Sequence, residues 1–214
     1  MGEGFVYDYL AGIEFPAWGS MYSGVIPLIP LGRWLMGIAV ILFITGIYLS
    51  RRRQIFLLET ARLGGRKNWW NVQFWNLFLV GTAGCFCYAL CMKGLNFFLH
   101  LQGVRGMEEI LILLLWLVHM MTLASIFCLL DLTAFWQPAA AFLFVTEVST
   151  DTVGFYRWNL SKYMFGNWGM YVQSTRVEKT YGFSPTAVML FQCLMIVVIW
   201  KLGRVLLEKK DNFA

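Results

Sequence analysis

Five apolar stretches dominate this 214-residue chain, and each is long enough, or nearly long enough, to cross a lipid bilayer. A helix needs about 20 apolar residues to span the hydrocarbon core. The stretches lie at about 30–50, 72–97, 108–130, 134–148 and 185–205. Hydrophobic residues make up 59% of the chain and charged residues 14%, which is more apolar surface than a soluble domain of this size could bury. We therefore predict an all-α fold, a polytopic transmembrane helical bundle with about five spans.

Two units are expected along the chain. Residues 1–29 are aromatic and weakly acidic, and we interpret them as an N-terminal interfacial segment. Their first 24 residues have no basic region ahead of an apolar one, so a cleavable signal peptide is not predicted. Residues 30–214 form the transmembrane domain, in which Pro30 and Pro185 suit the first turns of the first and last spans.

The distribution of positive charge predicts how the chain sits in the membrane. Six of the 17 Lys and Arg residues lie in 51–71 and four more in 201–210. The positive-inside rule places both segments in the cytoplasm. Alternation across five spans then puts the N-terminus outside and the C-terminus inside a bacterial cytoplasmic membrane, although 149–184 also holds four basic residues. Because the net charge of +5 gathers at span ends, we do not expect nucleic acid as a partner.

The segment 51–71 differs from the spans that flank it. Apolar residues from Ile55 to Leu63 lie between charged ends, and Gly64-Gly65 interrupts the pattern. The pattern predicts a cytoplasmic amphipathic helix, which either lies on the lipid as a linker or contacts a cytoplasmic partner. In the second case, the candidate docking residues are Arg51, Arg52, Arg53, Glu59, Arg62, Arg66 and Lys67. Trp69 and Trp70 add an aromatic signature typical of a membrane interface.

Three polar side chains inside the spans are candidates for a pathway through the bundle. They are His119, Gln192 and Asn76. Polar groups at such depth are costly and often functional, but each can also simply hydrogen-bond a neighbouring helix. Glu147, at the outer end of the fourth span, could pair with Arg157 or Lys162.

The region 149–184 is the most distinctive loop, because it is rich in Tyr, Trp, Phe and Met and is broken by Gly166 and Gly169. Its aromatic residues predict a re-entrant segment at the outer interface. This segment is either an interfacial belt without a ligand or a gate over a substrate path. The candidate gate residues are Glu147, Trp158, Tyr163, Trp168, Met170 and Tyr171.

No pattern of catalytic residues or of metal or cofactor ligands emerges. The chain has no GxSxG, HExxH or phosphate-binding loop motif, and its two histidines are nineteen residues apart. The five cysteines all fall within apolar stretches, where free cysteines behave as small hydrophobic residues, and their spacing fits no usual zinc site. We therefore expect no enzyme activity, no metal and no cofactor.

The end of the chain resembles a known family. The stretches NWGMYVQS at 167–174 and YGFSP at 181–185, together with the closing KKD at 209–211, are similar to the last part of permease subunits of type 2 ABC exporters. The order of spans, basic amphipathic helix and outer aromatic segment resembles the small bacterial exporters that handle peptides such as bacteriocins and antibiotics. The resemblance covers roughly residues 30–214.

This resemblance implies a transmembrane subunit that pairs with a second permease subunit, identical or not. A separate ABC-type ATPase would dock on the segment 51–67, and the outer segment would cap a pathway for a peptide or another amphipathic cargo. Members of the family usually have six spans, whereas here only residues 1–29 precede the first apolar stretch. Either that segment is a degenerate half-span or another subunit supplies the helix. The alternatives are an accessory or immunity protein that binds a permease or a toxin, and an intramembrane enzyme using His119 and Glu147.

Overall fold

A computed structural model describes residues 4–13, 28–101, 106–132 and 136–211 of the chain. Within these ranges the backbone forms α-helices and short 3₁₀ helices, and no strand. The all-α prediction is therefore confirmed for the described residues. The helices are α1 (Phe5–Leu10), α2 (Leu28–Gln54), α3 (Phe56–Leu63), α4 (Arg66–Phe98), α5 (Met107–Asp131), α6 (Trp136–Tyr156), α7 (Trp158–Ser161), η2 (Phe165–Gly169), η3 (Tyr171–Gln173) and α8 (Pro185–Asp211).

Four of the described helices are long and apolar enough to cross a membrane, which indicates a membrane-inserted protein. They are α2, α4, α5 and α8 as far as Glu208. The fourth predicted span, 134–148, falls in α6, which begins in the described chain at Trp136 and continues to Tyr156. Helix α6 is not among these four, and its second half carries Glu147, Asp151 and several threonines. A fifth crossing by α6 stays a prediction.

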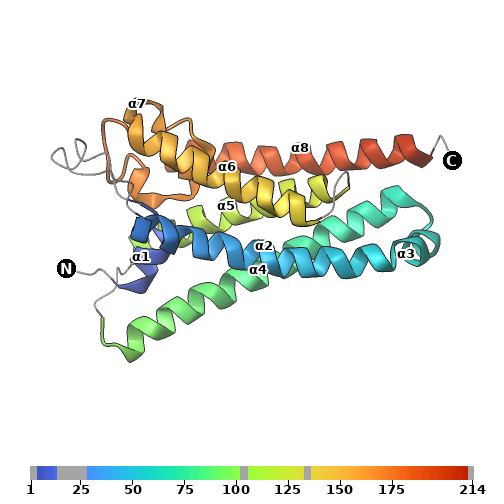
Figure 1. The fold of residues 1–214 in the computed structure, drawn as a ribbon, viewed down its shortest axis with the longest axis horizontal. Helices are drawn as coiled ribbons and strands as arrows, with labels where there is room; N and C mark the ends of the chain where they lie inside the picture. Colours follow the sequence, from blue (N-terminus) through green and yellow to red (C-terminus); the bar gives the residue numbers. More distant parts are fainter. Residues whose placement is uncertain (1–3, 14–27, 102–105, 133–135, 212–214) are drawn as a thin grey trace.

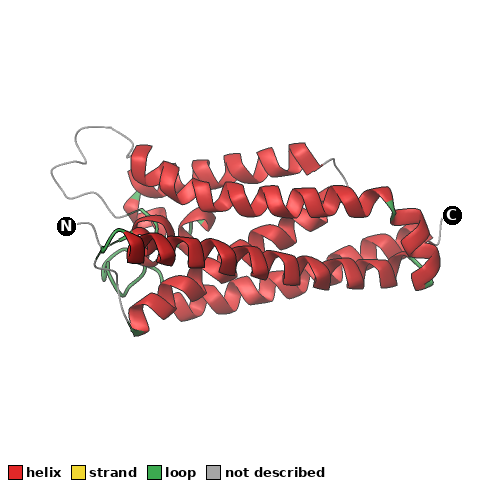
Figure 2. Ribbon diagram, turned by 90° about the horizontal axis from the view of Figure 1, so that it is seen from below, coloured by secondary structure: helices red, strands yellow, loops and turns green. Residues whose placement is uncertain are grey.

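The long helices form an elongated bundle through which the chain runs back and forth (Figures 1 and 2). One end, which we call the α1 end, holds α1, α7 and the 3₁₀ helices. The opposite end, the α3 end, holds α3 and the last turns of α8. Helix α5 occupies the centre, since 61% of its apolar window is buried, against 22% in α8. The large apolar side chains exposed on the outer helices are those that a lipid environment would cover, among them Phe43, Leu79, Phe86, Leu90, Leu190 and Leu194.

The basic segment at the α3 end is built differently from the expectation. Helix α2 continues through Arg51, Arg52 and Arg53, so these arginines form its last turn instead of the start of a separate amphipathic helix. That helix, α3, is limited to eight residues. Gly64 ends α3 in the left-handed conformation, with φ at 72°, and Gly65 has φ at 131°. The two glycines thus allow the chain to turn directly from α3 into α4.

Trp69 and Trp70, which the sequence marks as a membrane-interface signature, lie in the core of the bundle near the start of α4. Both are buried, with 6% and 0% of their surface exposed. Trp70 Nε1 donates a hydrogen bond to the main-chain oxygen of Trp200 at 2.8 Å. A side chain at Gly203 would collide with the Trp70 ring. The absence of a side chain at Gly203 therefore lets α8 approach α4 closely enough to enclose the Trp70 indole.

Candidate functional site

The candidate site is a group of polar side chains enclosed near the α1 end of the bundle. His119 lies midway along α5 and is fully buried. Its Nε2 is 3.3 Å from Glu147 Oε2 of α6, and its Nδ1 is 2.9 Å from Gln192 Nε2 of α8. Because the Gln192 amide nitrogen can only donate, Nδ1 is the acceptor and Nε2–H donates to Glu147. One imidazole thus joins Glu147 and Gln192, which lie 28 and 73 positions after His119 in the sequence.

Aromatic rings enclose this histidine and exclude water from it. Trp34 of α2 stacks on the imidazole with ring centroids 6.1 Å apart. Phe165 of η2 lies against it at 5.0 Å. Low polarity around a hydrogen-bonded group strengthens its electrostatic interactions and raises the cost of leaving any member unpaired. While these rings stay in place, the members of the polar group cannot exchange their partners for water.

A second carboxyl group lies one turn further along α6. Asp151 has only 3% of its surface exposed, and neither of its carboxylate oxygens has a hydrogen-bond partner among the described residues. Glu147 Oε1 is also without a partner. Burial, and to a lesser extent the neighbouring Glu147, raises the pKa of Asp151 well above its usual range. The site is therefore a pair of enclosed carboxyl groups opposed by one imidazole.

Residues 161–174, which we call the capping segment, cover the polar group. Gly166 N donates to Thr150 Oγ1 at 3.0 Å, and a side chain at this glycine would collide with Asp151 Oδ1. At Gly169, an added Cβ would be 2.7 Å from His119 Cγ. The two glycines that break the aromatic pattern in the sequence therefore bring the backbone against the polar side chains of α5 and α6.

An internal network holds the capping segment in shape. Ser161 Oγ donates to Gln173 Oε1 at 2.5 Å, and Asn167 Nδ2 donates to Ser161 Oγ at 2.8 Å. Gln173 Nε2 donates to the main-chain oxygen of Ile13 at 3.1 Å. All of these donors and acceptors are buried, so each hydrogen bond is protected from competition with water.

The N-terminal residues complete the cover. Val172 N donates to Ala11 O at 3.1 Å, which fixes the capping segment against the chain that leaves α1. Asp8 of α1 pairs with Arg33 of α2 at 3.1 Å. Part of the predicted interfacial segment is thus packed into the bundle, with Val6 and Leu10 buried. Residues 14–27 of that segment lie outside the described chain.

The candidate gate residues divide into a buried and an exposed group. Glu147, Met170 and Tyr171 are buried, Trp168 is half-buried against Phe191, and Tyr163 is 65% exposed. The side chain of Trp158 lies outside the described part. Burial, followed by the hydrogen bond that the Tyr171 hydroxyl donates to Glu108, raises the pKa of Tyr171 to about 12. Glu147 pairs with His119, and not with Arg157 or Lys162, both of which are exposed.

Of the three pathway candidates, Asn76 lies apart from the other two. His119 and Gln192 form the centre of the polar group, whereas Asn76 is on α4 beside Tyr48 of α2. Tyr48 belongs to a separate network, because its hydroxyl accepts from Arg52 Nε at 3.1 Å. Asn76 therefore connects with the α3 end and not with His119.

Several of the candidate docking residues at the α3 end are engaged within the chain. Arg52 pairs with Glu59, and Arg53 lies 3.9 Å from Asp131 at the end of α5. Lys67 pairs with Glu208 of α8 at 2.9 Å. These contacts hold the last turn of α2, α3 and the first turn of α4 to the rest of the bundle.

Helix α3 turns an apolar and basic surface outward. Phe56 packs edge-on against Trp69 with ring centroids 4.6 Å apart, so this residue anchors the helix. Leu57 and Leu58 are 78% and 76% exposed, and Arg62 is also exposed on the next turn. Arg51 is exposed at the end of α2. The apolar face expected to seat α3 in the bundle is therefore only partly used for that purpose.

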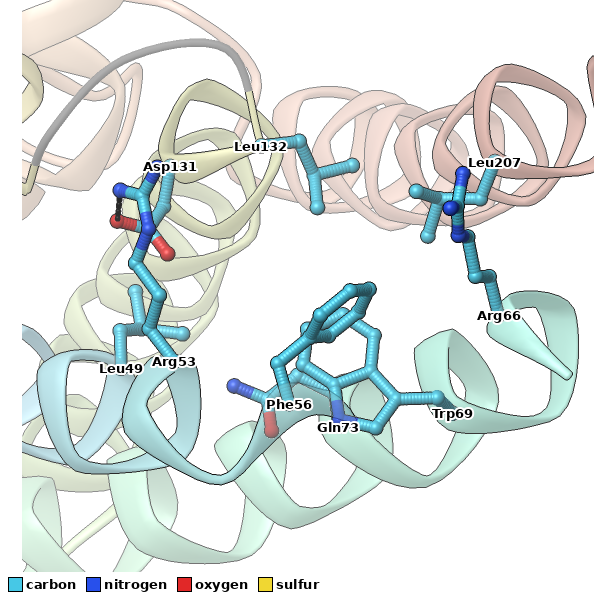
Figure 3. Close-up of a pocket in the computed structure, with 9 residues that line it drawn as sticks. All are labelled: Leu49, Arg53, Phe56, Arg66, Trp69, Gln73, Asp131, Leu132 and Leu207. Carbon is cyan, nitrogen blue, oxygen red and sulfur yellow. Dashed lines mark ion pairs between the residues drawn. The ribbon is translucent and has the colours of Figure 1, made fainter. Parts of the chain in front are cut away.

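A cavity of about 370 Å³ opens beside α3 (Figure 3). The Arg53–Asp131 pair stands on one side of it and Arg66 on the other, near Leu207 of α8. The remaining lining residues are Leu49, Phe56, Trp69, Gln73 and Leu132. Residues from five helices thus line the cavity. Most of the lining is apolar, and its two arginines outnumber its one aspartate.

Sequence reasoning identified His119, Glu147 and Gln192 one by one but not as a group. It missed Asp151, Ser161, Asn167 and Gln173. For Asp151 a signal existed, because an acidic residue four positions after Glu147 lies on the same helix face. The other three stand in a polar loop where exposure is the ordinary expectation, so only the fold reveals that they are buried.

Comparisons with protein-family models, with curated proteins and with solved structures found no match to this chain.

Proposed function

We propose that the chain is the transmembrane subunit of an ATP-driven exporter and that its α3 end docks a separate ATPase. The observation that carries the proposal is the outward surface of α3. Two adjacent leucines, each more than three-quarters exposed, stand beside Arg62 on a short helix held rigidly at the end of the bundle. An amphipathic helix of this kind, anchored on one side and open on the other, suits transmission of a motion between a bundle and a bound protein.

The anchoring contacts support this role. Because Phe56 and Glu59 tie α3 to α2 and α4, a force applied to the outward leucines would reach both long helices. Lys67 extends the connection to α8 through Glu208. Rigid contact is what distinguishes a coupling element from a loosely attached linker lying on lipid.

At the opposite end, the capping segment is the proposed outer gate. It rests on helices α5 and α6 through Gly166 and Gly169, and its backbone is joined to Ala11. A movement of α5 against α6 would therefore change the surface on which the capping segment packs. In this proposal, a second permease subunit, identical or not, completes the pathway for a peptide or another amphipathic cargo.

Co-purification from native membranes tests the docking surface. A Walker-type ATPase should be retained by the intact protein and lost on Leu57→Ser/Leu58→Ser and on Arg62→Glu. Lys179→Glu is the control, because Lys179 is an exposed basic residue in the loop between η3 and α8. If the ATPase stays bound to both α3 variants, the docking surface is wrong.

The same purification separates the exporter from its main alternative. If the protein retains a complete permease or a toxin and no ATPase contacts it directly, the chain is an accessory or immunity protein. Crosslinking from a cysteine introduced at Arg62 identifies the direct neighbour in either case.

A further inference from the structure

The two carboxyl groups of α6 lie next to each other in a setting that cannot accommodate two negative charges. Glu147 and Asp151 are one helical turn apart, with 0% and 3% of their surfaces exposed. Unpaired buried charge is so unfavourable that such a group ordinarily becomes neutral. The question is therefore which positive charge compensates the pair.

The elements around Asp151 supply very little positive charge. Helix α5 contributes His119, which is engaged with Glu147. Neither η2 nor α7 contains a titratable side chain, and Arg157 and Lys162, which flank α7, are exposed. On α2, the cation nearest this end is Arg33, which pairs with Asp8.

One imidazole therefore opposes two carboxyl groups, and the second carboxyl has no donor of its own among the described residues. A proton satisfies this shortage without needing space. A larger cation would need several oxygens arranged around an open position, and Gly166 instead closes against Asp151 Oδ1.

We propose that Asp151 is a buried proton-binding site and that the proton it holds keeps the capping segment seated. When Asp151 is neutral, its carboxyl group tolerates the backbone of Gly166 packed over it. When the proton leaves to water, the carboxylate requires hydration, and water reaches it only if Phe165–Gly169 lifts from α6. The proton is bound and released with no other bond made or broken.

This inference does not depend on the exporter proposal, since it concerns the chemistry of one carboxyl group and the segment above it. The burial of the carboxyl supports it independently, as does the raised pKa of Asp151 described above. Failure to find an ATPase would leave it unaffected.

Infrared spectroscopy of the protein in lipid tests proton occupancy directly. At neutral pH, the intact protein should show the carbonyl stretch of a protonated carboxyl group, and Asp151→Asn should lose that band. Glu178→Gln, which alters a carboxyl group in the loop before α8, is the control and should retain it. A spectrum in which Asp151→Asn retains the whole band would overturn the proposal.

Amide hydrogen exchange of residues 162–170 tests the link to the capping segment. At acidic pH, the intact protein and Asp151→Asn should exchange at equal rates. As pH rises above the pKa that Asp151 has when the segment is lifted and the carboxyl group is hydrated, the intact protein should exchange faster. The rate ratio should grow by up to about tenfold per pH unit, because lifting then releases a proton, and it should level off above the pKa of Asp151 in the seated state. The ratio at one pH cancels the intrinsic pH dependence of exchange. A ratio that does not change with pH contradicts the proposed link between Asp151 and the capping segment.

Glu147→Gln provides a second measurement if Asp151→Asn fails to fold. Removing the negative charge beside Asp151 weakens its hold on the proton. Once the intrinsic pH dependence of exchange is removed, the rise in exchange of residues 162–170 should then level off at lower pH than in the intact protein. A rise that levels off at the same pH would show that the carboxyl groups do not interact and would also overturn the proposal.

Discussion

His119 connects three helices at the scale of a single residue. Its two ring nitrogens reach Glu147 of α6 and Gln192 of α8, while the ring itself belongs to α5. A neutral imidazole with one donating and one accepting nitrogen can satisfy both contacts at once. The sequence suggested that a histidine within a span could simply hydrogen-bond a neighbouring helix. His119 makes such a bond to each of two neighbouring helices.

Gln192→Leu should destabilise the protein by about 1–3 kcal/mol, because it leaves the buried Nδ1 of His119 without a donor. Thermal unfolding in detergent measures the change. Gln54→Leu, at the exposed end of α2, is the matched control and should unfold near the temperature of the intact protein. Equal stability of the two variants would mean that Gln192 makes no net contribution through this bond.

Gly169→Ala should destabilise the protein by about 1–3 kcal/mol, because the new Cβ would overlap the imidazole of His119 and force the capping segment away. Gly94→Ala is the control, since nothing lies within 4 Å of its added Cβ and alanine favours a helix. Unfolding temperatures of the pair decide the matter, and a Gly169→Ala variant as stable as the Gly94→Ala variant would refute the close approach.

Sequence reasoning located these residues but could not assemble them. Depth within an apolar stretch singles out His119 and Gln192, because polar side chains are rare there. Their pairing depends on how α5 and α8 rotate about their axes, which hydropathy does not specify. Asp151 escaped notice because it follows the apolar part of α6 and looks like an ordinary loop residue.

At the scale of elements, the capping segment and α1 form one cooperative unit. Gln173 accepts from Ser161 and donates to Ile13, so a single side chain fixes both the fold of the segment and its junction with the N-terminal residues. The amide hydrogens of such a unit exchange slowly only while the whole unit stays closed.

Gln173→Leu should therefore raise amide exchange in two separate stretches, 5–13 and 161–173, while α5 remains protected. Exchange monitored by mass spectrometry reads both stretches in one experiment. Lys179→Leu is an exposed control on the same loop and should leave both stretches unchanged. Faster exchange in 161–173 alone would show that α1 is held by its contacts with α2 and α4 and not by Gln173.

Hydropathy predicts the long helices well because each must be apolar over about 20 residues to lie in lipid. Four stretches were confirmed as helices of sufficient length and apolarity. Hydropathy supports α6 less strongly than the other spans because the carboxyl groups of Glu147 and Asp151 lie on the face it turns inward. The ends of α2 and α3 were misplaced, since a run of arginines does not stop a helix whose backbone is still hydrogen-bonded.

At the scale of the whole molecule, the two ends of the bundle have different characters. The α3 end gathers the basic residues of 51–67 and the last turns of α8, joined by the Lys67–Glu208 pair. The α1 end carries the covered polar group. This division agrees with the expectation, drawn from charge, that 51–71 and 201–210 lie on one side of the membrane.

Directional cysteine labelling tests most directly the central claim that the α3 end faces the cytoplasm. The exposed native cysteines, Cys87, Cys91 and Cys193, are first replaced by serine. We predict that a membrane-impermeant maleimide reaches Arg62→Cys only from the cytoplasmic side and Lys179→Cys only from the outside. Labelling of Arg62→Cys from the outside would remove α3 from any cytoplasmic ATPase and contradict the account.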